Sequence, residues 1–178
     1  MKSIKSILLI IFTITIVVAC SNSKTKMTAK INTLEKELKD SKNAYDKKKS
    51  EELMSTYLAY TETYKKDTIV PSYLFKAGEI CMNLNKSQKA LELFDRVSKE
   101  FPDFKKAGDC LFLKGFIYEN NLQDINNART AYMDFIKKFP THQFADDAQI
   151  LIQNLGKSPE ELIKEFEAKN QEKLNAGK

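Results

Sequence analysis

The sequence predicts an all-α protein built from repeated helical hairpins. Three apolar stripes begin at Leu53, Ala90 and Ala128, at a nearly constant interval, and each places its members at steps of four, three and four. The stripes are Leu53, Tyr57, Tyr60 and Tyr64; Ala90, Phe94, Val97 and Phe101; and Ala128, Tyr132, Phe135 and Phe139. Such steps keep apolar side chains on one helix face, and their recurrence indicates internal repeats. Five Gly and four Pro in 178 residues are also few for a β-rich fold.

The first nineteen residues have the composition of a signal peptide. Lysines precede the apolar run 7–18, which is too short to span a bilayer as a helix but suits the hydrophobic region of a secretory signal. An alanine and Cys20 close the run, and polar residues follow at once. This junction resembles the lipobox of bacterial lipoproteins. The resemblance implies that 1–19 is a cleaved lipoprotein signal peptide and that 20–26 is a lipidated cysteine with a polar tether. The alternative is an ordinary signal peptide, or a membrane anchor, that happens to contain a cysteine.

The lipobox resemblance also implies a location. Two or three acyl chains on Cys20 anchor a protein stably in a membrane. Ser21 is not the aspartate that retains many lipoproteins at the inner membrane, so an outer-membrane protein facing the periplasm is expected. Residues 20–49 carry a net charge of +5 and could touch anionic headgroups, although a solvated helix face is the simpler interpretation. The basic residues lack interleaved aromatics, so no nucleic-acid partner is expected.

Each of the last two stripes is preceded by another predicted helix, near 72–84 and near 108–119. We call these upstream helices first-type helices, and the helices that carry the stripes second-type helices. Both stripes end at a Phe-Pro pair, and Pro102 and Pro140 cannot continue a helix. Each unit is therefore a helical hairpin.

Gly78 and Gly115 lie in the middle of the two upstream helices, where glycine costs about 1 kcal/mol relative to alanine. Ala90 and Ala128 follow them at closely similar intervals. We expect each glycine to face the alanine of its hairpin, where small residues let the helices approach closely.

These features resemble the tetratricopeptide repeat, over 71–104 and 108–142. The matching residues are Gly78, Ala90, Phe94, Val97 and Pro102 in the first segment, and Leu111, Gly115, Tyr118, Ala128, Tyr132, Phe135 and Pro140 in the second. The second segment has one inserted residue in the 120–127 turn. A degenerate first repeat is expected within 27–67. The resemblance implies a helical-hairpin solenoid of about three repeats and leaves activity open.

Capping helices are expected at 143–169. A third helix of the first type is indicated by Ala145, Ala148, Ile150, Leu151 and Leu155, and Gly156 is expected to end it. Ser158 then has the pattern of an N-cap before Pro159. An apolar face on this last helix, expected to close the stack, is made by Leu162, Ile163 and Phe166. The tail 170–178 is expected to fray.

Residues 27–45 allow two interpretations. Apolar residues follow a heptad pattern at Met27, Ile31, Leu34 and Leu38, continued by Ser41 and Tyr45. A short coiled-coil stalk would use this seam to form an oligomer and to act as a structural tether. The simpler interpretation is the first helix of the degenerate repeat.

Residues that carry catalysis or bind metals are scarce. His142 is the single histidine and is expected in a loop, without a carboxylate partner, so histidine triads and zinc clusters are not expected. The acidic pairs at 146–147 and 160–161 suit helix N-termini. Cys81 and Cys110 are expected to be buried and, in the repeat arrangement, too far apart for a disulfide. The sequence predicts no enzyme, no cofactor and no metal ion.

The chain as a whole resembles periplasmic repeat proteins of the bacterial envelope, such as those associated with the Tol–Pal system, and more distantly the repeat lipoproteins of outer-membrane β-barrel assembly. This resemblance implies a scaffold that holds an envelope protein or peptide segment in a concave groove lined by the first helices. The residues carried over are Phe75, Glu79, Met82, Asn83, Phe112, Phe116, Glu119 and Asn120. For Phe75 and Phe112, packing between repeats is the alternative.

Overall fold

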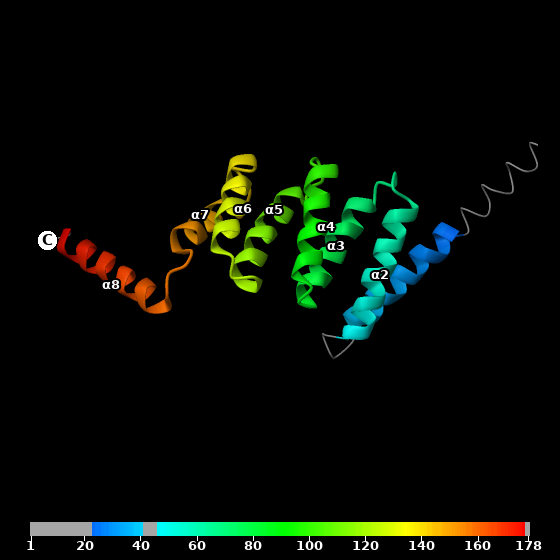
Figure 1. Ribbon diagram of the computed structural model, residues 1–178, viewed down its shortest axis with the longest axis horizontal. Coiled ribbons are helices and arrows are strands. Elements are labelled where there is room, and N and C mark those ends of the chain that lie inside the picture. The colour runs from blue at the N-terminus through cyan, green and yellow to red at the C-terminus, as the bar shows by residue number, and fades with distance from the viewer. Residues whose placement is uncertain (1–22, 41–45, 177–178) are drawn as a thin grey trace, which may run out of the picture. The chain divides into compact units, whose positions relative to one another are not determined.

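The computed structural model describes residues 23–40 and 46–176, and all regular elements in these ranges are helices (Figure 1). They are helix 23–40, α2 (Lys47–Thr63), α3 (Val70–Asn83), α4 (Ser87–Glu100), α5 (Ala107–Phe116), the π-helical turn η1 (Ile117–Asn121), α6 (Ile125–Lys138), α7 (Ala145–Asn154) and α8 (Pro159–Ala176). The predictions for the signal peptide, Cys20, Ser41 and Tyr45 lie outside the described residues. The helices fall into two compact units, which meet in the sequence between Leu84 and Asn85.

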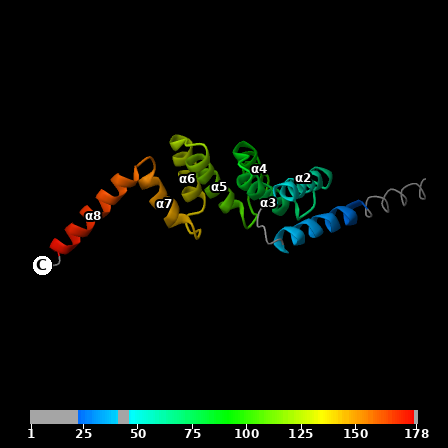
Figure 2. The same ribbon diagram turned by 90° about the horizontal axis from the view of Figure 1, so that it is seen from below.

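In the first unit, helix 23–40 lies against α2, as the two views of the ribbon show (Figures 1 and 2). Ile31 is fully buried and Leu34 is 7% exposed. Ion pairs of 2.8 Å join Lys30 to Glu52, and Lys49 to Glu37. The apolar face that a stalk would need is therefore occupied inside the unit, which favours the interpretation as the first helix of a degenerate repeat.

Aromatic packing joins α2 to α3. Tyr57 and Tyr60 are buried, as their stripe predicts, and their rings lie 4.8 and 5.0 Å from that of Tyr73. Glu35 of helix 23–40 accepts hydrogen bonds from the Tyr57 hydroxyl and, at 2.6 Å, from Lys76 of α3. Burial acts to raise the pKa of Glu35, but these hydrogen bonds hold it below its ordinary value. One carboxylate thus joins the three helices that the structure describes in this unit.

In the second unit, α6 packs against both α5 and α7. The cluster at its centre consists of Leu111, Ala128, Tyr132, Phe135, Ala148 and Leu155. The stripe of α4 is buried as well, at Ala90, Phe94 and Val97. Lys114 of α5 donates to Asp95 of α4 at 2.6 Å, so that a polar contact supplements the apolar one. Both predicted apolar stripes in this unit therefore form core.

In the α5–α6 hairpin, the predicted close approach of two helices at Gly115 is confirmed, but the residue that faces this glycine differs from the predicted one. Gly115 is buried where the two helices approach, as expected, but the ring of Tyr132 faces it rather than Ala128. The extra residue of this repeat is accommodated in a π-helical turn, in which the Leu122 amide donates to the Ile117 carbonyl at 3.1 Å. The insertion thus begins earlier than the expected 120–127 turn, and it lengthens the helix rather than the loop.

The end of α7 and the start of α8 lie where the sequence predicts them. Gly156 has φ +81° just after α7, as a C-terminal glycine should. The Glu161 amide donates to Ser158 Oγ at 3.2 Å, and the Ser158 amide donates to the Glu161 carboxylate at 2.8 Å, which completes a capping box. Both acidic pairs lie in first turns of their helices, as expected.

The packing of α8 differs from expectation. Ile163 is 58% exposed and Phe166 is 67% exposed, so this face does not close the stack. The helix also continues to Ala176, although residues from 170 were expected to fray. The capping box at Ser158 favours the start of this helix, and the many good helix formers that follow favour its continuation, whereas burial of its apolar face would need a surface of matching shape.

Candidate partner-binding surface

The predicted groove residues of α3 have unlike environments in the first unit. Phe75 is only 6% exposed, which favours the packing alternative for this side chain. Met82 is half-buried, whereas Glu79 and Asn83 are exposed. The predicted groove residues that α3 exposes to solvent are therefore polar.

The ring of Phe112 in α5 is engaged in packing within the second unit. It stacks on Phe144, with ring centroids 4.9 Å apart, and lies 5.6 Å from the rings of Tyr132 and Phe135. Aromatic contacts of this kind stabilise a core beyond the area that they bury. The alternative of packing between repeats is therefore favoured for Phe112 as well.

Phe116 and Ile150 are the large apolar side chains that remain exposed on α5 and α7. Phe116, one turn beyond Phe112, is 40% exposed, and Ile150 is 55% exposed. Ile150 was expected only to continue the repeat pattern and was not predicted to bind a partner. Ile150 follows Phe112 at the same interval that separates Ala90 from Ala128, so it occupies in the following repeat the position that Phe112 has in its own. This correspondence in the sequence could have identified Ile150 as a candidate binding residue.

Glu119 and Asn120 lie in η1 and both make contacts within the hairpin. The Tyr132 hydroxyl donates to Glu119 at 2.8 Å, and the Asn120 side-chain amide donates to the Phe116 carbonyl at 3.1 Å. Burial and then the hydrogen bond to Glu119 raise the pKa of Tyr132 above its ordinary value. These two residues hold the π-helical turn beside Phe116, while Asn120 is also exposed to solvent.

His142 lies in the loop before α7, as expected, but it has a carboxylate neighbour. Its Nε2 lies 3.5 Å from Asp109 Oδ2, and Lys106 Nζ lies 3.1 Å from the other oxygen of that carboxylate. The imidazole also packs edge-on against Phe135, with ring centroids 5.2 Å apart. The sequence missed Asp109 because it comes from the start of α5, a whole hairpin upstream of the loop. Its role here is to position the α6–α7 loop.

An open hollow of about 670 Å³ lies at one end of the first unit, lined by Lys24 and residues 62–68. Asp67 in this hollow accepts hydrogen bonds from Lys24 at 2.5 Å and from the Tyr60 hydroxyl at 2.6 Å. The Lys24 contact, then that of Tyr60 and the backbone amide of Ile69, lower the pKa of Asp67 to about 2.

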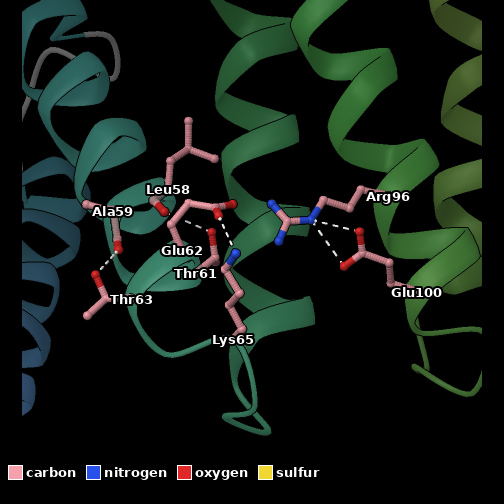
Figure 3. A network of polar contacts seen from close by, with 8 residues as sticks. All are labelled: Leu58, Ala59, Thr61, Glu62, Thr63, Lys65, Arg96 and Glu100. Carbon is pink, nitrogen blue, oxygen red and sulfur yellow. Dashed lines mark hydrogen bonds and ion pairs between the residues drawn. The ribbon is translucent and has the colours of Figure 1, made fainter.

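The polar contacts at this end of α2 can be followed in Figure 3. Lys65 lies 3.4 Å from Glu62, and Thr61 and Thr63 donate back to the carbonyls of Leu58 and Ala59. In the second unit, Arg96 donates to both oxygens of Glu100 one turn later in α4, at 3.0 and 3.2 Å. These contacts stabilise helix ends and leave the lysines of the hollow exposed.

Two segments match the sequence model of the tetratricopeptide-repeat family, residues 72–103 and 109–142. Both segments are similar to tetratricopeptide repeats. They agree with the segments expected from the sequence, and with α3–α4 and α5–α6. No curated protein matches the chain. The fold is therefore an all-α tetratricopeptide-repeat solenoid, a class that typically binds proteins or peptides and rarely carries catalysis itself.

The described residues contribute two further observations. Cys81 and Cys110 are buried, as expected, and Cys81 Sγ lies 3.3 Å from the Met54 sulfur. Among the helices of 23–40 and 46–176, none has both the length and the apolar composition needed to cross a membrane.

Proposed function

We propose that this protein is a lipid-anchored, non-catalytic scaffold of the bacterial envelope that binds a partner polypeptide on α5 and α7. The observation that carries the proposal is the exposure of Phe116 and Ile150 on first-type helices of successive repeat units. Large apolar side chains exposed among polar ones are typical anchors of protein–protein contacts. The repeat family supports the same interpretation, because its members generally bind peptides or proteins.

The chemistry of the partner follows from the neighbours of these anchors. Asp146 and Asp147 are exposed in the first turn of α7, and Glu119 is half-buried beside Phe116. Carboxylates next to apolar anchors favour a segment that carries apolar side chains between basic residues. We therefore propose an extended or helical peptide of this composition as the ligand.

The proposed location rests on the sequence around Cys20. The apolar run, the small residue before the cysteine and the polar residues after it support lipidation at the outer membrane, facing the periplasm. The likeness to repeat proteins associated with the Tol–Pal system and with β-barrel assembly supports a partner among the envelope proteins.

Capture of the partner from envelope membranes tests the binding surface. The variant Phe116→Ala with Ile150→Ala should reduce capture by roughly tenfold or more, since each apolar anchor contributes about 1 kcal/mol or more. Met133→Ala is the matched control, because Met133 is a large apolar side chain 57% exposed on α6, a second-type helix. Equal capture by the double variant and the wild type, at equal melting temperature, would exclude this surface.

The location has a separate test. Cys20→Ala should abolish incorporation of labelled fatty acid and leave the apolar run uncleaved. Mass spectrometry of the wild-type N-terminal peptide should show a diacylglyceryl cysteine. An unmodified Cys20 in the wild-type protein would refute the lipoprotein assignment while leaving the binding surface in place.

A further inference from the structure

We propose that one end of the first unit is a membrane-contact edge that binds the anionic phosphate headgroups of phospholipids. The edge consists of Lys24, Lys26, Lys65, Lys66 and Ile69. The inference rests on the proposed lipid anchor at Cys20. It adds that the folded unit itself touches the bilayer, in one defined orientation.

Two contacts bring the residues of the edge together. Lys24 Nζ lies 2.5 Å from Asp67 Oδ2, so the first turn of helix 23–40 is held against the α2–α3 loop. The same oxygen accepts the Tyr60 hydroxyl at 2.6 Å, which fixes Asp67 on α2. Lys65 and Lys66 immediately precede Asp67 and are exposed. Lys26, also exposed, lies in the same first turn of helix 23–40 as Lys24 and lines a separate hollow with Thr56 and Ala59 of α2. Residues far apart in the sequence therefore share one end of the unit.

Covalent reach places this end at the membrane. Only Ser21 and Asn22 stand between Cys20 and Ser23, where the described helix begins, and even a fully extended chain spans at most about 11 Å over that distance. A lipid on Cys20 therefore keeps Lys24 within roughly 15 Å of the anchored cysteine, a separation of at most about two Debye lengths at physiological salt. Lys47, where α2 begins, is at the other end of this helix of 17 residues, roughly 25 Å from the edge along the helix axis.

The composition of the edge suits an anionic interface. Four lysines stand against the two carboxylates Glu62 and Asp67, so the edge retains a net positive charge. Ile69 is 38% exposed in the loop and offers an apolar side chain at the same level. Lysine stems lie along apolar surface while their ammonium groups reach phosphates, and each basic residue near such a surface adds to the attraction.

A fluorescence experiment on the full lipidated chain in vesicles tests the proposal. An environment-sensitive dye is attached at Thr68→Cys, with wild-type protein as the labelling blank, since Cys81 and Cys110 are buried. Vesicles contain either phosphatidylcholine alone or phosphatidylcholine with phosphatidylglycerol. We expect a blue-shifted emission in the anionic vesicles that disappears at about 0.5 M salt, where the Debye length is only several ångströms.

Charge removal identifies the residues responsible. Lys65→Gln with Lys66→Gln should lower the ratio of membrane-bound to free edge by roughly 30-fold, which corresponds to two lysines near an anionic surface. Lys47→Gln with Lys48→Gln is the matched control, an exposed lysine pair at the far end of α2, and should leave the emission unchanged.

Three outcomes overturn the proposal, in two different ways. The membrane-contact edge is excluded, and the lipid anchor is unaffected, if the emission of a lipidated chain is identical in neutral and anionic vesicles. The same conclusion follows if both lysine variants lose the blue shift to the same extent. A mature chain without lipid on Cys20 removes the anchor and this inference with it.

Discussion

The backbone of Gly115 lies directly against the ring of Tyr132. A methyl group added at Gly115 would come within 2.5 Å of ring carbons Cδ1 and Cε1, closer than carbon atoms pack in proteins. Tyr132 is fully buried and its hydroxyl is tied to Glu119, so the ring cannot easily move away. The α5–α6 crossing therefore depends on the absence of a side chain at one residue.

Gly115→Ala should accordingly destabilise the protein by about 1–3 kcal/mol, although alanine favours a helix by about 1 kcal/mol over glycine. Urea unfolding measures the difference. In a Tyr132→Leu background, the same substitution should be nearly neutral or stabilising, because the obstructing ring is gone. A stabilised single variant would show that the helices can separate at little cost.

Asp67 should contribute acid-sensitive stability. Folding lowers the pKa of Asp67 from 3.8 to about 2, chiefly through Lys24, so its stabilisation is complete above pH 3.8 and is lost as the pH falls towards 2. Because Lys24 is half exposed, solvent screening limits the effect to about 1 kcal/mol. The variant Asp67→Asn should be less stable than wild type by about this amount at pH 7. On acidification, its free energy of unfolding should fall by less than that of wild type. Asp103→Asn, at an exposed loop position, serves as the control.

Gln123 occupies the left-handed region, with φ +54°, at the end of the α5–α6 turn. Asn85, at the corresponding position of the preceding repeat, has φ +56°, and asparagine tolerates this conformation better than glutamine. Gln123→Gly should therefore raise the free energy of unfolding by about 0.5–1 kcal/mol. Gln123→Ala, which keeps the strained Cβ, should give no such increase in thermal melting.

Phe112 and Phe116 should respond in opposite ways to truncation. Phe112→Ala removes a ring that packs on Phe144, Tyr132 and Phe135, and should cost about 3 kcal/mol of stability. Phe116→Ala removes an exposed ring and should change stability by less than about 1 kcal/mol. Circular-dichroism melts of the two variants distinguish them, and similar losses would contradict the assignment of Phe116 to a binding surface.

Ile31→Ala tests the role of helix 23–40. The side chain is fully buried in the first unit, so its truncation should cost about 2–4 kcal/mol and the lipid-free protein should sediment as a monomer. A trimer with an unchanged melting temperature would instead support the coiled-coil stalk.

The stripes of α4 and α6 could be predicted because burial along a helix repeats every few residues in the sequence itself. Phe94, Val97, Tyr132 and Phe135 are all buried as their spacing indicated. The capping box at Ser158 was predictable for a similar reason, since its two partners, Ser158 and Glu161, lie within one helical turn.

Tertiary structure decided which of the remaining apolar side chains are available to a partner. Phe112 and Phe116 are one turn apart and chemically identical, yet Phe144 covers only the first. The carboxylate of Asp109 meets His142 only because the α6–α7 loop returns to the start of α5. Periodicity and capping are short-range properties that a sequence displays directly. The exposure of one side chain depends on atoms from residues far along the chain, so only the packed structure determines it.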